Sequence, residues 1–126
     1  MMKFKFLLWA LTKLLQRAVK RSPACARYVE RKELVFQIQT QGGIGRHFRI
    51  HGGEITSKAG LTSNPQFTMT FRDADKGFSI LSAKDSKGAF LAALHDEDLN
   101  LSGDFVEVMW FQGLTEFLKP ANAPQH

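Results

Sequence analysis

The chain has 126 residues, of which 44% are hydrophobic and 23% are charged, and eleven are Phe. This composition predicts one folded domain with a real apolar core and excludes a chain that is disordered throughout. No uninterrupted apolar run reaches the roughly 18 residues that a membrane-spanning helix needs. The single cysteine, Cys25, excludes an internal disulfide and fits a reducing compartment, so we expect a cytoplasmic protein.

Charge is divided unevenly along the chain. Residues 1–32 contain nine Lys or Arg and one Glu, whereas residues 33–126 contain eight Lys or Arg and eleven Asp or Glu. The basic character therefore belongs to the N-terminal segment, and the rest of the chain is slightly acidic. A nucleic-acid-binding domain would be basic over its body, so we expect no nucleic-acid partner.

Residues 1–22 have the pattern of an amphipathic helix that ends near Pro23. At 100° per residue, eight side chains fall within an apolar arc about 140° wide: Phe4, Leu7, Leu8, Leu11, Leu14, Leu15, Ala18 and Val19. Thr12 and Gln16 lie with the cations on the other side. A secretory signal peptide is the alternative, but Lys13 interrupts the apolar run and cations precede the Ala24–Ala26 stretch, so we expect the helix to be retained.

The opposite side of this helix combines positive charge with two aromatic side chains. Such a surface is typical of peripheral attachment to an anionic membrane, here the inner face of a cell membrane. The residues expected to contact the membrane are Lys3, Lys5, Phe6, Trp9, Lys13, Arg17, Lys20 and Arg21. Packing of the apolar arc on the domain itself or on a second subunit is an equally supported use of the helix.

From residue 34 the apolar period changes to two, which indicates strands. Alternation is present in residues 34–39 and 46–51, with glycine-rich turns at residues 41–45 and 52–53, and a weaker strand surrounds Ile55. Residues 67–71, "FTMTF", give the clearest strand pattern. Two short helices then follow, and a last strand, "DLNLSG", precedes the final helix. The order predicts one mostly antiparallel sheet of five strands with helices on one face, an α+β fold.

The helix starts are marked by N-cap residues. We expect N-caps at Asp73, at Asp85 or Ser86, and at Asp104. Glu107, three residues after Asp104, completes the pattern of a capping box. Pro120 is expected to end the final helix. Residues 120–126 have little to pack and are expected to form a flexible tail.

No catalytic or metal-binding constellation is visible. His47 and His51 share one side of a strand with Arg49 between them, and a cation is a poor neighbour for a divalent metal. The glycine-rich turns lack the lysine of a P-loop and the spacing of a dinucleotide fingerprint. Arg21 and Arg27 near Cys25 could lower its pKa, but without a His partner we expect Cys25 to be a packed residue. We therefore expect no enzyme activity, no metal and no cofactor.

The final helix has more apolar surface than one contact with a sheet requires. Its apolar residues cover about 240° of the helix circumference: Phe105, Val106, Met109, Trp110, Phe111, Leu114, Phe117 and Leu118. The sheet accounts for part of this surface. The rest must meet a ligand, a second subunit or the N-terminal helix.

Residues 33–118 resemble the sterol carrier protein 2 (SCP2-like) lipid-binding domain. The features that carry the resemblance are a strand introduced by Asn64-Pro65, a short helix after Asp73, an aromatic at Phe90 in the second helix, and the ending D-x-L-x-L-x-G-D at residues 98–104. Ala83 and Glu97 stand where this family usually has glycine. The resemblance implies a five-stranded sheet with helices over one face and an apolar tunnel between them.

The resemblance also implies a non-catalytic lipid carrier for a sterol-, acyl- or isoprenoid-like ligand. The tunnel lining is expected to comprise Phe67, Met69, Phe71, Phe78, Leu81, Phe90, Leu94, Leu101, Met109 and Leu114, with Phe105, Trp110 and Phe117 nearer its entrance. The alternative is a protein–protein module, for example an accessory factor in isoprenoid-quinone synthesis, whose apolar helix faces form a homodimer or complex interface. We expect a basic helical segment over residues 1–32, the lipid-binding domain over 33–119 and a tail over 120–126.

Overall fold

The computed structural model describes residues 2–81, 83 and 86–118. Its elements follow the predicted order, with a second N-terminal helix and a final 3₁₀ turn added. They are α1 (Met2–Arg21), α2 (Pro23–Val29), β1 (Leu34–Thr40), β2 (Gly45–His51), β3 (Glu54–Ala59), β4 (Phe67–Phe71), α3 (Ala74–Leu81), α4 (Ser86–His95), β5 (Leu99–Gly103), α5 (Phe105–Thr115) and η1 (Glu116–Leu118).

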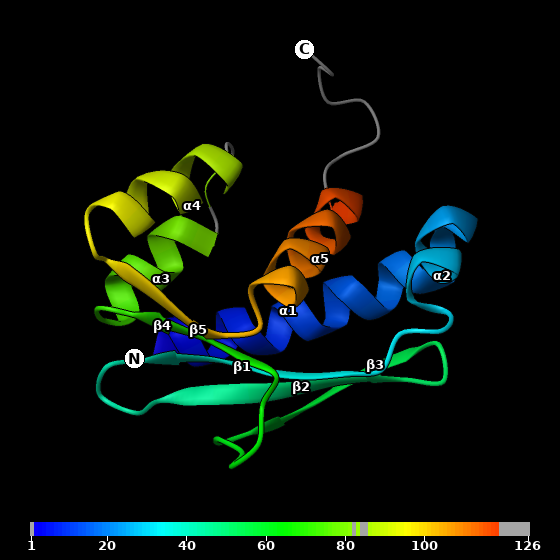
Figure 1. The fold of residues 1–126 in the computed structure, drawn as a ribbon, viewed down its shortest axis with the longest axis horizontal. Helices are drawn as coiled ribbons and strands as arrows, with labels where there is room; N and C mark the ends of the chain where they lie inside the picture. The colour runs from blue at the N-terminus through cyan, green and yellow to red at the C-terminus, as the bar shows by residue number, and fades with distance from the viewer. Residues whose placement is uncertain (1, 82, 84–85, 119–126) are drawn as a thin grey trace.

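The five strands form one sheet in the order β3-β2-β1-β4-β5. β1 pairs in parallel with β4, and the other neighbouring strands are antiparallel. All the helices lie on the same side of this sheet, with α1 running beneath α5 and α3 and α4 grouped beside β4 and β5 (Figure 1). The predicted α+β fold with a mostly antiparallel sheet and helices on one face is confirmed.

The two faces of the sheet differ as the alternation in β1 predicts. Leu34, Phe36 and Ile38 are buried under the helices. On the other face, Gln37 and Gln39 donate hydrogen bonds to Thr68 and Thr70 across the parallel pair, at 3.2 and 3.0 Å. These side-chain bonds satisfy polar groups on the face that no helix covers, and they help to fix the register of the two central strands.

Helix α1 packs on its own domain. Phe4, Leu8 and Leu15 are fully buried, and the ring of Phe4 lies edge-on to Phe71 with centroids 6.2 Å apart. The polar edge of the contact is bonded as well, because Gln16 Nε2 donates to the Ile55 carbonyl at 2.8 Å. Of the uses that the sequence left open for the apolar arc, the structure shows packing on the sheet.

The buried stripe of α1 is rotated relative to the predicted arc. Thr12, expected on the polar side, is only 4% exposed, whereas Leu14, expected in the apolar arc, is 48% exposed. Thr12 is buried without penalty because its hydroxyl donates to the Leu8 carbonyl at 3.0 Å and lies 2.7 Å from Ser57 Oγ. A hydrogen-bonded threonine thus replaces a leucine at the centre of the contact.

Helix α2 begins where α1 ends. Ser22 is its N-cap and accepts a hydrogen bond from the Cys25 amide at 3.2 Å, and Pro23 occupies the first turn. Proline ends one helix because it lacks an amide hydrogen, and for the same reason it suits the first position of the next. Pro23 therefore ends α1, as predicted, and also begins α2, which was not predicted.

The predicted caps are confirmed in part. Asp73 Oδ1 accepts from the Lys76 amide at 2.8 Å, and Asp104 Oδ1 accepts from the Val106 amide at 3.0 Å. The capping box is wrong in its second half, because the Asp104 amide donates to the Gln66 carbonyl and the Glu107 carboxylate pairs with Lys32. Asp85, the side chain of Ser86, and Pro120 lie outside the described residues.

Candidate functional site

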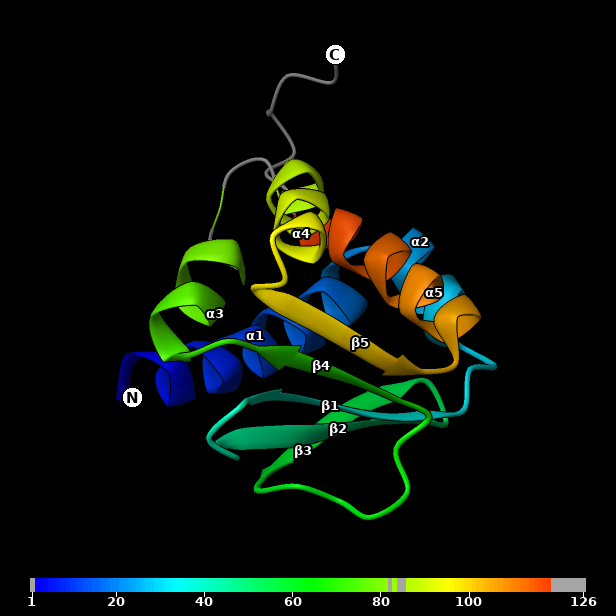
Figure 2. The same ribbon diagram turned by 60° about the vertical axis from the view of Figure 1, so that its left-hand side comes forward.

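The predicted tunnel lining spans β4, β5, α3, α4, α5 and η1, and α3, α4 and α5 are arranged around β4 and β5 (Figure 2). The structure places these side chains at three depths. Phe67, Met69, Phe71, Phe90 and Leu114 are buried. Half-buried positions are Phe78, Leu81, Leu94, Leu101, Trp110 and Phe117. Phe105 and Met109 are exposed.

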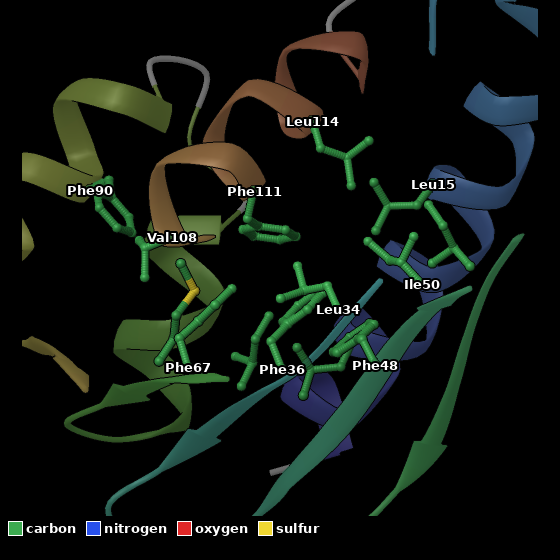
Figure 3. Packing of buried hydrophobic residues seen from close by; sticks show 14 of the residues in the cluster. Leu15, Leu34, Phe36, Phe48, Ile50, Phe67, Phe90, Val108, Phe111 and Leu114 are labelled. Atoms are coloured by element: carbon green, nitrogen blue, oxygen red, sulfur yellow. The ribbon is translucent and has the colours of Figure 1, made fainter. Parts of the chain in front are cut away.

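Aromatic side chains pack densely over β4. Phe36 stacks on Phe67 with ring centroids 4.9 Å apart, and Phe111 of α5 lies 4.7 Å from Phe36 and 6.0 Å from Phe67 (Figure 3). Phe4 of α1 packs in the same way against Phe71, at the other end of β4. A ligand that reaches β4 must lie beside these rings or separate them. Sequence reasoning missed Phe4, Phe36 and Phe111 as neighbours of the site, although each lay in an apolar pattern that it had identified.

Helix α1 closes the other side of this cluster. Its Phe4 ring lies so near α3 that a Cβ at Gly77 would come 2.5 Å from the ring. Lys3 also lies over the Phe78 ring, 5.8 Å from the centroid. Gly77 is therefore the position that allows α1 and α3 to approach closely. The N-terminal helix and the predicted lining form one packed unit.

Helix α2 covers one side of α5. Tyr28 stacks on Trp110 at 4.8 Å, its hydroxyl donates to the Trp110 carbonyl at 2.7 Å, and its ring lies 5.5 Å from Phe117. Lys32 also lies over the Trp110 ring, 4.9 Å from its centroid, and pairs with Glu107. Burial raises the pKa of the Tyr28 hydroxyl. Trp110 and Phe117 are thus held by the segment that follows α1.

The beginning of α5 remains uncovered. Phe105, Val106 and Met109 are 59%, 74% and 52% exposed. They follow directly on the capped start of α5, while Val108, Phe111 and Leu114 of the same helix point into the core (Figure 3). The excess apolar surface predicted for this helix is therefore divided among the sheet, α2 and solvent. We call these three residues the exposed α5 patch.

All eight residues that were predicted to contact a membrane lie on the outer face of α1 and are exposed. Phe6 is 65% and Trp9 45% exposed, and their rings lie 5.7 Å apart with Lys13 over Trp9. Helix α1 contains no acidic residue, and none of its cations forms an ion pair with another described residue. Its outer face is thus an open basic surface with aromatic side chains at its centre.

The candidate reactive residues have ordinary structural partners. His47 contacts the Gly60 carbonyl at 3.0 Å and His51 contacts Glu33 at 2.6 Å. Cys25 is buried, and burial raises the pKa of its thiol, contrary to the effect considered for the nearby arginines. Within the part of the chain that the structure describes, no three His, Cys, Asp or Glu residues are grouped as a metal site requires. The same residues include no helix long and apolar enough to cross a bilayer.

No protein-family model matches the sequence, and no curated protein matches it. Solved structures do match the fold. One described as "UbiJ-SCP2 Ubiquinone synthesis protein" superposes with a TM-score of 0.70 at 16% identity, covering 91% of this chain and 97% of its own. The sterol carrier protein domain 2 of Helicoverpa armigera gives 0.63 at 14% identity, with 94% and 91% covered. A sterol carrier protein 2 crystal structure gives 0.56 at 14%, with 87% and 94% covered. The chain therefore has the fold of the sterol carrier protein 2 domains.

Proposed function

We propose that this protein is a non-catalytic lipid-binding protein that holds a sterol-, acyl- or isoprenoid-like ligand between the sheet and the C-terminal helices. The observation that carries the proposal is the exposed α5 patch, because the other faces of α5 are already packed on the sheet and on α2. The proposal is supported by the fold, which this chain shares with structures described as sterol carrier proteins. In this proposal the exposed Phe105 and Met109 would be reached first by the ligand, and the half-buried Leu94 and Leu101 would lie deeper.

Binding would depend on apolar burial. Each Å² of apolar surface removed from water contributes about 25 cal/mol, so a long chain that covered the exposed α5 patch would bind without many polar anchors. Such a site discriminates weakly between ligands that differ by one methylene. A lipid of a given chemical class, rather than one compound, is the expected ligand.

The direct test is the lipid content of the purified protein. Native mass spectrometry and solvent extraction should show a bound lipid, and an environment-sensitive acyl probe should bind to the delipidated protein. The double variant Phe105→Ser/Met109→Ser should bind the acyl probe more weakly. Leu61→Ser, which changes an equally apolar and 43% exposed side chain outside the helices, should not. Absence of both a co-purified lipid and probe binding overturns the proposal.

The outer face of α1 is the proposed contact with an anionic membrane. The apolar face of α1 is packed on the sheet, and its outer face is exposed. The outer face can therefore contact a membrane while the helix stays packed on its domain. Each Lys or Arg near an anionic surface contributes about 1 kcal/mol, and Phe6 and Trp9 add the interfacial contact that aromatic side chains favour.

Vesicle sedimentation tests this contact with charge-matched variants. The triple variant Lys13→Gln/Arg17→Gln/Lys20→Gln should lose binding to phosphatidylglycerol-containing vesicles. Arg49→Gln/Lys58→Gln/Lys87→Gln, which removes the same charge from exposed positions elsewhere, should keep most of it. Equal loss in both variants, or binding that ignores salt and lipid charge, contradicts the proposal.

A second function has an observation of its own. The exposed α5 patch is also suited to a protein partner or a second copy of this chain, and a neighbour described as a ubiquinone synthesis protein favours an accessory role in isoprenoid-quinone synthesis. Light scattering of the delipidated protein separates the two functions. A dimer that Met109→Ser dissociates, with no acyl-probe binding, favours the scaffold over the carrier.

A further inference from the structure

We propose that α1 and the β1–β2 turn form a binding site for a phosphate group, with Lys5 and Arg46 as its cationic residues. The proposal rests on the membrane contact proposed above and deepens it, because a phospholipid headgroup is one source of that phosphate. Free phosphate is the other source, and the experiments below distinguish the two.

The site is a half-open hollow of about 310 Å³ between the N-terminal half of α1 and the turn that joins β1 to β2. Lys5 and Leu8 line it from α1, Arg46 from β2, and Gly43 and Gly60 from the loops. One water molecule takes up about 30 Å³ in the liquid, so the hollow accommodates a hydrated phosphate. It is lined by two cations, and no acidic side chain is among its described lining residues.

Arg46 is the more deeply placed of the two cations in this hollow, and it is bonded to Ser57. It pairs with Ile38 in the β1–β2 register and is two residues from Phe48, so its side chain lies on the helix-covered face of the sheet. Its Nε donates to Ser57 Oγ at 2.6 Å, and Ser57 is in turn bonded to Thr12 of α1. These bonds hold the guanidinium beneath α1, where it is half-buried.

Arg46 has a neutral partner in place of a carboxylate. Neither Arg46 nor Lys5 takes part in an ion pair within the described parts of the chain. Partial burial of a guanidinium carries a desolvation cost, which an anion offsets through charge-assisted hydrogen bonds. Since Nε is used by Ser57, the remaining guanidinium nitrogens are the donors for a phosphate, a group that arginine recognises well.

Lys5 connects this hollow to the outer face of α1. Lys5 and Trp9 are four residues apart and so share one side of the helix. Gly43 and Gly60 line the loop side without a side chain, and a Cβ built at either position would meet no atom within 4 Å. A headgroup phosphate can therefore reach Lys5 and Arg46 while Trp9 and Phe6 contact the same lipid surface.

The first experiment follows inorganic phosphate by NMR with the ¹⁵N-labelled full-length protein. At constant ionic strength, phosphate but not chloride should shift the amides of Gly43, Gly45 and Gly60 and the Nε of Arg46. Arg46→Gln should weaken this binding about tenfold or more, and Lys5→Gln should weaken it as well. Arg49→Gln is the matched control, because Arg49 lies on the opposite face of the same strand and is exposed.

The second experiment compares Arg46→Gln and Arg49→Gln on phosphatidylglycerol-containing vesicles. A larger loss for Arg46→Gln identifies a headgroup as the source, whereas equal vesicle binding together with the NMR difference identifies free phosphate. If Arg46→Gln and Arg49→Gln behave alike in both experiments, the site is overturned. Circular dichroism checks that each variant is folded. Lys5→Gln changes an exposed side chain and Arg46→Lys keeps the positive charge, so both variants should stay folded even if Arg46→Gln does not.

Failure of this site and failure of the lipid carrier function are separable. The acyl probe is measured on the same preparations, and the Lys5 and Arg46 variants should bind it as the unmodified protein does. Probe binding without the phosphate effect overturns only the phosphate site. A phosphate effect without probe binding overturns only the carrier function.

Discussion

The N-terminal helices α1 and α2 and the C-terminal helices α3, α4 and α5 cover the same face of the sheet by opposite means. Helix α1 has one buried stripe, with the hydrogen-bonded Thr12 within it, and one basic outer face that also carries Phe6 and Trp9. Helix α5 is apolar around most of its circumference, so it needs the sheet on one side and Tyr28 of α2 on another, and still leaves the exposed α5 patch. The C-terminal helices therefore have apolar surface that the fold itself does not cover, whereas the exposed aromatic side chains of α1 lie among its cations.

The largest expected effect separates the two faces of α1. Phe4→Ala should lower the free energy of unfolding by about 3–5 kcal/mol, because it removes a fully buried ring that packs on Phe71. Phe6→Ala, two residues away and 65% exposed, should change it by less than about 0.5 kcal/mol. Urea unfolding of both variants measures the difference. Similar losses would show that the outer face of α1 is packed as well.

The second prediction concerns the contact between the two halves. A Cβ at Gly113 would lie 2.3 Å from the Tyr28 hydroxyl, so Gly113→Ala should cost about 1–3 kcal/mol through overpacking, less about 1 kcal/mol of gained helix propensity. In a Tyr28→Phe background the obstructing oxygen is absent, and the same substitution should be neutral or stabilising. A double-mutant cycle measures the coupling. Additive effects would mean that α2 does not hold α5 as the structure shows.

The sequence predicted helix α1 better than it predicted α2 and the contacts of α5. The basic face of α1 follows directly from the 3.6-residue period, and all eight predicted outer residues are exposed, although the buried stripe is rotated toward Thr12. Helix α2 was missed because its seven residues are too few to show a helical period and begin at Pro23, and with it the contact of Tyr28 on α5 was missed. Glu107 was assigned to a capping box because its partner Lys32 is remote in sequence and becomes a neighbour only through the fold.

The positions of the site residues show the same limit. Alternation in β4 correctly places Phe67, Met69 and Phe71 on the covered face. The rings of Phe111 of α5 and Phe4 of α1 pack directly on Phe67 and Phe71 and so occupy space that a ligand would need. The distance between a helix and the sheet cannot be deduced from the periodicity of either sequence. Pattern therefore predicts which face is apolar, and packing decides how much of it is left for a ligand.

A third, smaller effect is expected at the end of α4. Glu97 stands where the SCP2-like pattern has glycine, and its φ is 61°, in the left-handed region. Its amide and that of Asp98 donate to the Leu94 and Ala93 carbonyls, which is the bond pattern of a Schellman motif. Glu97→Gly should raise the free energy of unfolding by about 1 kcal/mol, whereas Glu97→Ala should give no such gain. Thermal unfolding of the two variants tests whether the C-terminal half carries this backbone strain.

The smallest expected effect lies on the sheet surface that neither half of the helical layer covers. The hydrogen bond from the His51 imidazole, 2.6 Å away, lowers the pKa of the Glu33 carboxyl. A carboxyl whose pKa is lower in the folded state adds stability above its unfolded pKa, and this contribution is lost as the pH falls through the folded pKa. Because both side chains are more than 60% exposed, salt should reduce it further. NMR titration of His51→Gln should show the Glu33 pKa returning toward its ordinary value, with the unfolding midpoint at neutral pH almost unchanged. An unchanged Glu33 pKa would mean that His51 is not the group that lowers it, and a large loss of stability would mean that this exposed pair contributes to the fold as the buried contacts of α1 and α5 do.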